Sequence, residues 1–546
     1  MRLPRVLVLL TAISATALSP VLPATATPPA HVAAGPGNPL TAPAPVLRGV
    51  NLESATIPDL QRAMDRHQLS SAQLTAFYLA RIQALDPRLH AVLKVNPDAV
   101  AQAVASDRRR RQHDLRGPLD GIPVLLKDNI DTADRQGTTA GSFALAGTPP
   151  ARDAFLVGKL RRAGAVLIGK ANLSEWANFR GTSSSSGWSA VGGQNNNPYV
   201  LDRNPSGSSA GSGSGISANL ATVAIGTETH GSIVHPSGQN GIVGIRPTLG
   251  LISRGGVVPV TLEQDTAGPM ARHLVDAALT LQVIRGVDPA DPATAAAAPY
   301  DAVNYLRTFR PGALRGKRIG LWLAGTGGEN VPAVGAIMTR VVSELRRLGA
   351  TVVPADLPFQ DQIGGPEFAA ALVEFKHDIR AYLATRPGNH PKTLAELIAF
   401  NNAHAAVEMP FFGQETFEAA EATSGDLTDP VYRQQRRTAT TLAKRSIDDT
   451  LTGLHLDAII APTNGPAWKT RLPGGDMLDQ LVLSSAPAGV AGYPSVTVPA
   501  GFDGPFPIGV SFIGPRFGEQ ELLPLAYAYE QGTQARRPPT FIPTIG

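Results

Sequence analysis

Segments of strand type alternate with segments of helix type along this chain, and this alternation limits the possible folds more than any other feature. Residues 121–131 form a short apolar run of β type, residues 153–165 carry a helical pattern, and residues 166–173 are again of β type. Strands that alternate with helices indicate an α/β sheet. Further strand candidates lie towards the C-terminal end, at 457–463, 495–501 and 508–514.

Helical patterns fill most of the remaining sequence. Residues 56–67 and 70–85 each start with Thr or Ser and carry apolar residues three or four positions apart, and about 270–455 is mostly helical. Because strand candidates flank this long span, a division into independent domains would leave part of the sheet unpaired. We therefore predict one large α/β domain over residues 51–546, with helical insertions at about 270–455.

The first residues predict export. Arg2 and Arg5 flank an apolar run, and 24-ATA-26 offers small residues for cleavage. This is the pattern of a secretory signal peptide, whereas a membrane anchor needs roughly 20 apolar residues. We predict a signal peptide over residues 1–26 and a disordered lead-in over residues 27–50. The mature protein is then expected to be secreted or periplasmic, without stable membrane association.

The amino-acid composition limits the kinds of catalytic and metal site that the chain can form. The 546 residues include no cysteine, which excludes a thiol nucleophile, a disulfide framework and a thiolate metal site. No HExxH motif occurs among the 11 histidines, and the neighbouring His230 and His235 are more typical of packing or surface positions than of metal ligands. The formal charge of +4 is small for this length, so nucleic-acid binding is not expected. We interpret the run 108-RRRR-111 as a solvated turn at the end of a helix.

A lysine and two serine-bearing segments are the candidates for chemistry. Lys127 lies within the apolar run 122–129, where a charge is costly unless it is paired or neutralised. Residues 206–215, SGSSAGSGSG, have the composition of a flexible linker, yet segments of ordered type flank them. A turn at Gly231-Ser232 follows another apolar run.

Two familiar motifs occur in the serine-rich stretch without the context that they need. Residues 207–211 spell G-x-S-x-G, and Gly213 to Ala218 mimic a dinucleotide fingerprint. Both motifs require a buried strand directly before them, but residues 194–205 are polar and contain two prolines. We therefore predict neither a nucleophile elbow nor a nucleotide site here.

Taken together and in this order, these pieces resemble the amidase signature family. That family carries Gly-Gly-Ser-Ser-Gly-Gly and, after a helix, Gly-Thr-Asp-x-Gly-Gly-Ser-Ile-Arg-x-Pro. Here 206-SGSSAGS-212 and 226-GTETHGSIVHP-236 stand in those places, and 117–130 and 486–501 extend the resemblance. It implies the family's fold, a mixed central β-sheet covered by helices. It also implies an amidase that breaks carboxamide C–N bonds with no metal and no cofactor.

The resemblance assigns a Ser-Ser-Lys triad. Ser232 takes the place of the nucleophile, Ser208 that of the bridging serine and Lys127 that of the base. It also implies a cis peptide bond between Gly207 and Ser208, in an ordered active-site loop. Physical chemistry agrees with these roles, because a serine needs a base in order to attack, and burial can lower the pKa of a lysine towards neutrality.

The same resemblance implies an oxyanion hole made by the backbone N–H groups of Thr229, His230, Gly231 and Ser232. A tight turn can direct successive N–H groups at one oxygen, and removal of one such donor typically costs about 10²–10³ in rate. His230 departs from the family, in which most relatives have Gly at this position. Its N–H can still serve, while its side chain is expected to affect the choice of substrate.

Within the family, the chain is most similar to peptide amidases, which remove the C-terminal amide from peptides. The stretches 173–181 and 526–539 carry this closer similarity. The predicted function is an exported amidase that acts on a small amide or peptide amide through an acyl-serine intermediate. Three alternatives remain open: a general aliphatic or aryl amide hydrolase, a subunit of a glutamine-dependent amidotransferase, and a non-catalytic binding protein.

Overall fold

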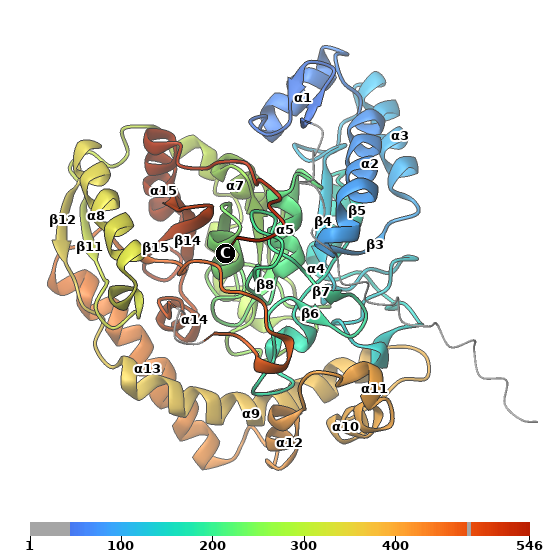
Figure 1. Cartoon of the computed structure of the whole chain (residues 1–546), viewed down its shortest axis with the longest axis vertical. Helices are drawn as coiled ribbons and strands as arrows, with labels where there is room; N and C mark the ends of the chain where they lie inside the picture. Colours follow the sequence, from blue (N-terminus) through green and yellow to red (C-terminus); the bar gives the residue numbers. More distant parts are fainter. Residues whose placement is uncertain (1–43, 478–481, 546) are drawn as a thin grey trace, which may run out of the picture. The chain divides into compact units, whose positions relative to one another are not determined.

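A mixed β-sheet connects distant parts of the sequence (Figure 1). The computed structural model describes residues 44–477 and 482–545, and 11 of the strands found there form one sheet. In this sheet β14 (Ser495–Asp503), near the C-terminal end, pairs with β9 (Val243–Arg246) from the middle of the chain. The sheet therefore belongs to one large α/β domain, which confirms the predicted fold class.

Both parallel and antiparallel neighbours occur in the sheet. β4 (Pro123–Lys127) lies between β5 (Val166–Ala171) and β8 (Val223–Glu228) and runs parallel to both. β10 (Thr266–Ala271) runs antiparallel to β8 and β9. The order is β12-β11-β13-β15-β14-β9-β10-β8-β4-β5-β3. The other strands are β1 (Val46–Leu47), β2 (Val50–Asn51), β3 (Val92–Val95), β6 (Trp188–Ser189), β7 (Gly193–Gln194), β11 (Arg318–Leu321), β12 (Thr351–Pro354), β13 (Ala458–Pro462) and β15 (Phe506–Ile513).

The first helices begin where the sequence supplies a cap. α1 (Ile57–Asp65) follows Thr56 and α2 (Ser71–Leu89) follows Ser70, and each cap hydroxyl accepts a hydrogen bond from the N–H three residues later. Both predicted helices are thus confirmed. The other α-helices are α3 (Ala99–Arg111), α4 (Phe155–Arg162), α5 (Ala210–Ser217), α6 (Val234–Gln239), α7 (Leu274–Ile284), α8 (Pro332–Arg347), α9 (Gln360–Thr385), α10 (Leu394–Ala403), α11 (Ala405–Glu408), α12 (Glu415–Glu421), α13 (Pro430–Gly453), α14 (Ala486–Ala491) and α15 (Glu519–Thr533).

The long helical span contains two strands that its sequence pattern does not predict. Helices α7 to α13 lie within about 270–455, but β11 and β12 extend the sheet beyond β13 at one edge. Each of the two strands has only four residues, too few for a period of two to stand out. Helices α9 and α13 pack against each other in the lower part of Figure 1.

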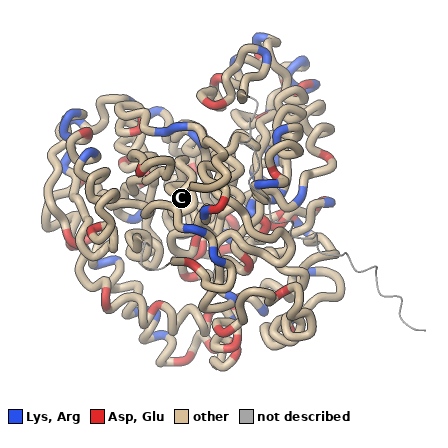
Figure 2. Tube along the Cα trace, viewed as in Figure 1, with Lys and Arg blue, Asp and Glu red and all other residues tan. Residues whose placement is uncertain are grey.

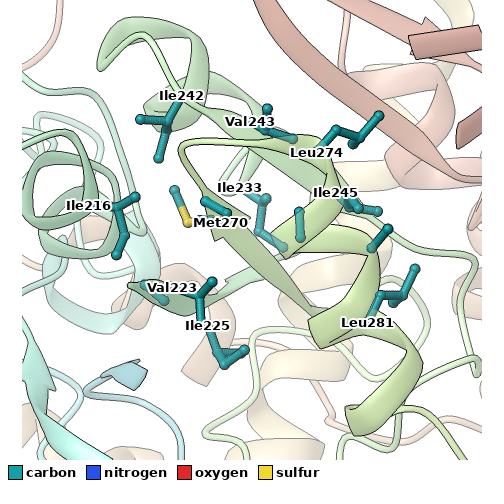
Figure 3. Packing of buried hydrophobic residues seen from close by; sticks show 14 of the residues in the cluster. Ile216, Val223, Ile225, Ile233, Ile242, Val243, Ile245, Met270, Leu274 and Leu281 are labelled. Atoms are coloured by element: carbon teal, nitrogen blue, oxygen red, sulfur yellow. The ribbon is translucent and has the colours of Figure 1, made fainter. Parts of the chain in front are cut away.

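A cluster of buried apolar side chains lies around the central strands (Figure 3). Ile225 of β8, Ile245 of β9 and Met270 of β10 are fully buried there. Ile233, which directly follows Ser232 in the sequence, joins the same cluster. The hydrophobic core therefore anchors the chain immediately after the predicted nucleophile.

The serine-rich stretch is ordered, as the resemblance implies, but most of it is a helix rather than a loop. All residues of α5, from Ala210 to Ser217, are buried. A Cβ atom on Gly211 would lie 2.6 Å from the backbone nitrogen of Asn172, and one on Gly213 would lie 2.9 Å from the carbonyl oxygen of Pro236. The glycines thus permit a close approach of backbones that no larger residue allows.

Charged positions of both signs are mixed along the chain trace (Figure 2). The arginine run 108–111 forms the last turn of α3, as predicted. The prediction that this turn is solvated is wrong for two of its residues. Arg109 lies 2.6 Å from a carboxylate oxygen of Asp120, and Arg110 is buried and pairs with Asp65.

The predicted signal peptide over residues 1–26 and the lead-in up to residue 43 lie outside the described residues. From residue 44 onwards, β1 and β2 form an antiparallel hairpin, so ordered structure begins before the predicted boundary at residue 50. Among the helices of 44–477 and 482–545, none is long and apolar enough to cross a membrane. In the same ranges, no three His, Asp or Glu side chains are grouped so that they could hold a metal ion.

Candidate active site

Lys127 is the last residue of β4, and its side chain is fully buried. Its Nζ atom lies 2.7 Å from Ser208 Oγ, 2.9 Å from Thr227 Oγ1 and 3.2 Å from the carbonyl oxygen of Thr227. The strand that carries Thr227, β8, runs parallel beside β4, so the sheet sets the distances between the two residues. All three hydrogen-bond partners are uncharged oxygen atoms.

Burial lowers the pKa of the Lys127 amine from its ordinary value of 10.5 to about 7. Loss of hydration disfavours the ammonium form, whereas the nearby carboxylates of Asp265 and Glu228 favour it and limit the shift of the pKa. A large fraction of the amine is therefore neutral at pH 7. In that form it can accept a proton from the hydroxyl of Ser208.

Ser208 lies in the loop before α5, and its side chain is fully buried. The Gly207–Ser208 peptide bond is cis, which confirms the expectation from the resemblance. The next residue, Ser209, donates its N–H to the carbonyl oxygen of Ser232 at 3.2 Å. Ser209 also donates its hydroxyl to the carbonyl oxygen of Thr227 at 3.0 Å. These hydrogen bonds hold the serine loop, the Ser232 turn and β8 together.

The turn at residues 229–232 follows β8 directly and leads into α6. Gly231 has a φ of 81°, a left-handed conformation that favours glycine. Within the described part of the chain, none of the four backbone N–H groups of this turn donates a hydrogen bond to another protein group. Ser232 is partly exposed, whereas Lys127 and Ser208 are buried. A substrate can therefore reach the turn from solvent while the amine stays shielded from water.

Two charged residues that the sequence analysis did not single out fix the shape of the turn. The carboxylate of Glu228 accepts hydrogen bonds from the N–H groups of Ile233 at 2.7 Å and Val234 at 3.1 Å. The buried guanidinium of Arg246 donates to the carbonyl oxygens of Glu228 at 3.0 Å and Thr229 at 2.9 Å. Arg246 thus fixes the carbonyl groups at the start of the turn, and the four N–H groups of residues 229–232 make no hydrogen bond to other described protein groups.

Asp265, which directly precedes β10, binds the first residue of the turn, Thr229. Its carboxylate accepts a hydrogen bond from Thr229 Oγ1 at 2.6 Å and from the N–H groups of Val260 and Thr261. Burial raises the pKa of this carboxyl to about 6, although these hydrogen bonds act in the opposite direction. Glu228 lies between two threonines and Asp265 between Gln264 and Thr266, so no local sequence signal marks either carboxylate. Arg246 follows the apolar Ile245 of β9, but its role depends on contacts that only the fold creates.

The two histidines near the turn have different environments. His230 lies on the surface of the turn, with its side chain 44% exposed and its Nε2 atom 3.8 Å from Glu367 Oε1. His235 is partly buried, and burial lowers the pKa of its imidazole to about 4, so that it is neutral at pH 7. The structure thus brings Lys127, Ser208 and the Ser232 turn together, and neither histidine is hydrogen-bonded to Lys127 or Ser208.

Comparison with known proteins relates the chain to amide-cleaving enzymes. Residues 73–523 match the family model described as Amidase. A probable amidase of Arabidopsis thaliana is 42% identical, over 90% of this chain and 92% of that protein. A glutamyl-tRNA(Gln) amidotransferase subunit of Geobacter metallireducens is 34% identical, over 89% of this chain and 98% of that protein. The structure of the native peptide amidase from Stenotrophomonas maltophilia superimposes with a TM-score of 0.85 and 49% identity, covering 89% of this chain and 99% of that chain.

Proposed function

Since this chain belongs to the amidase family and is an enzyme that hydrolyses amides, we propose that it removes the C-terminal amide of peptides through an acyl-serine intermediate. The 49% identity to a structurally characterised peptide amidase supports this substrate class. The observation that carries the mechanism is the 2.7 Å contact between the buried Lys127 amine and the Ser208 hydroxyl.

In the proposed first step, the neutral Lys127 amine accepts the proton of Ser208, and Ser208 accepts the proton of Ser232. The Ser232 oxygen then forms a bond to the carbonyl carbon of the substrate amide. A pKa of about 7 suits this role, because a general base works best when its pKa is near the operating pH. The amine of Lys127 and the hydroxyls of Ser208 and Ser232 thus form a proton relay that contains no histidine.

Attack moves the carbonyl π electrons onto oxygen, and the free N–H groups of residues 229–232 are the donors for this oxyanion. When the oxyanion collapses, the C–N bond breaks and the leaving nitrogen takes the proton from Lys127 through Ser208. Ammonia leaves, and an ester on Ser232 remains. Water then attacks this ester by the same proton route and releases the free acid.

A Ser232→Ala variant tests this mechanism, with ammonia release from N-acetylphenylalaninamide as the measurement. We expect a loss of about 10⁴-fold or more in kcat, as for other enzymes that lose the nucleophile of a catalytic triad. A fluorophosphonate probe is expected to label wild-type protein and not the variant. Turnover of the variant at the wild-type rate would exclude Ser232 as nucleophile.

A glutamine-dependent amidotransferase subunit is the second candidate, favoured by the 34% identity to such a protein over nearly its whole length. This role requires partner subunits, and glutaminase activity would depend on them. Ammonia release by the purified single chain from amidated peptides, at rates that added glutamine does not match, would support peptide amidase over this alternative.

We also propose that the protein is exported. The support is the sequence alone, with Arg2 and Arg5 flanking an apolar run and 24-ATA-26 as a cleavage pattern. N-terminal sequencing of protein recovered from outside the cytoplasm is expected to begin at Thr27. An intact Met1 on the active protein would contradict the proposal.

A further inference from the structure

A contact between the turn at residues 229–232 and the long helix α9 brings a carboxylate close to this turn. His230 lies between two of the free N–H donors, and its imidazole is partly exposed. The carboxylate that it approaches, at 3.8 Å, belongs to Glu367 of α9. The Cβ of His230 lies close to Gly489 of α14. The imidazole therefore extends from the turn towards α9.

Glu367 uses only one of its two carboxylate oxygens. Its Oε1 atom accepts a hydrogen bond from Gln264 Nε2 at 3.1 Å and faces His230. Within the described residues, Oε2 takes part in no hydrogen bond and no ion pair. The side chain is 11% exposed, so it is largely withdrawn from solvent. An unused oxygen of a largely buried carboxylate is a strong hydrogen-bond acceptor.

Gln264, which donates a hydrogen bond to Glu367, is itself held by two arginines. Arg436 of α13 donates to the side-chain oxygen of Gln264 at 2.6 Å, and Arg246 donates to the backbone carbonyl of Gln264 at 2.8 Å. Arg246 is the same residue that holds the carbonyl groups at the base of the catalytic turn. The positions of Glu367 and of the oxyanion donors are therefore set by one connected group of hydrogen bonds.

We propose that Glu367 is a specificity-determining residue whose free carboxylate oxygen accepts a hydrogen bond from the α-nitrogen of the substrate. This inference rests on the proposed function. A carbonyl oxygen bound by the turn keeps the neighbouring α-carbon, and the nitrogen on it, close to the turn. Amidated peptides and amino-acid amides carry an N–H donor at this position, whereas simple aliphatic and aryl amides do not. The carboxylate thus selects peptide-like amides.

The experiment compares two substrates that differ in one donor. N-acetylphenylalaninamide carries the α N–H, and O-acetyl-3-phenyllactamide has an ester oxygen in its place. We expect the wild-type enzyme to favour the first by about 10- to 100-fold in kcat/KM for ammonia release, the range for a hydrogen bond to a charged group. Glu367→Gln keeps the size of the side chain and removes its charge, and it is expected to reduce this ratio to within a few-fold of one. Asp361→Asn, an exposed carboxylate on the same helix, is the matched control and is expected to keep the wild-type ratio.

The outcomes separate this inference from the proposed function. If the wild-type enzyme releases ammonia from neither substrate, the proposed function fails. If it hydrolyses both and the ratio is near one, or if the ratio is the same in Glu367→Gln as in the wild type, the role of Glu367 is overturned while the amidase remains. The wild-type comparison needs no variant, so a folding defect cannot hide the result. Phenylalaninamide, with its α-ammonium group, then distinguishes recognition of a cation from recognition of a neutral N–H.

Discussion

At the scale of single residues, two buried lysines on neighbouring strands have different partners, and these partners suit only one of the lysines to the proposed role of base. Lys170 of β5 lies 3.6 Å from the carboxylate of Asp128, which stabilises its ammonium form. Lys127 of β4 contacts only hydroxyl and carbonyl oxygens. Burial lowers the pKa of both amines, but only the second faces a serine hydroxyl with which it can exchange a proton. The partner, rather than burial alone, assigns the chemical role.

The pKa of Lys127 predicts the dependence of activity on pH. The amine must be neutral to accept a proton, and it is neutral above its pKa of about 7. We expect kcat/KM for an amidated peptide to level off above pH 7 and to fall about tenfold for each pH unit below it. A rate profile from pH 5 to 9, with circular dichroism as a control for folding, measures this. Activity that stays constant down to pH 5 would exclude Lys127 as the base.

At the scale of elements, α5 shows how far composition can mislead. Its Gly and Ser residues are typical of a linker, yet the helix is buried against strands of the central sheet and helix α6. Gly211 and Gly213 permit the close approach, and the preceding loop presents Ser208 to Lys127. The close packing of this helix is therefore what positions the bridging serine.

A pair of substitutions separates packing from helix propensity. Gly211→Ala in α5 places a methyl group against the backbone of Asn172, and we expect it to lower the free energy of unfolding by about 1–3 kcal/mol. Gly335→Ala in α8 meets no atom within 4 Å and is expected to raise this free energy by about 0.5–1 kcal/mol. Urea unfolding measures both. Equal changes in the free energy of unfolding for the two variants would show that α5 is packed less tightly than the contacts of Gly211 indicate.

The sequence predicted the elements whose own residues determine them. Strands β4, β5 and β13 and the capped helices α1 and α2 could be found from local patterns. Strands β11 and β12 could not, because each is four residues long and depends on partners far away in the sequence. At the site, motif resemblance predicted Lys127, Ser208 and Ser232, and the structure places the first two in hydrogen-bond contact. Arg246 and Glu367 were missed because their importance lies in contacts with backbone or side chains that only the fold brings near.

At the scale of the whole molecule, the strand order interleaves distant parts of the chain. β13 and β15, from beyond residue 457, lie between β11 and β14, and β14 in turn pairs with β9. A fragment that ends before β11 would leave β9 without this neighbour. Because the sheet is shared in this way, the described domain is expected to unfold as one cooperative unit.

The four tryptophans can test this cooperativity, since Trp176, Trp188, Trp322 and Trp468 are all buried. Trp322 packs with residues of α13, whereas Trp176 and Trp188 pack against phenylalanines in residues 411–417. We expect thermal unfolding followed by tryptophan fluorescence to have the same midpoint as unfolding followed by far-UV circular dichroism. A Trp322→Phe variant, which removes the signal near α13, is expected to leave the two midpoints coincident with each other. Two separated transitions would indicate that the helical insertions unfold independently of the sheet.

The free donors of the catalytic turn belong to the main chain, and this has a consequence for how such an enzyme can diversify. Every amino acid except proline supplies a backbone N–H, so a change of side chain at position 230 leaves the electrostatic support of the reaction in place. The side chain at position 230 also reaches towards Glu367 of α9, which we propose as the residue that recognises the substrate. Natural variation at this point can therefore alter what is cleaved without first damaging the ability to cleave.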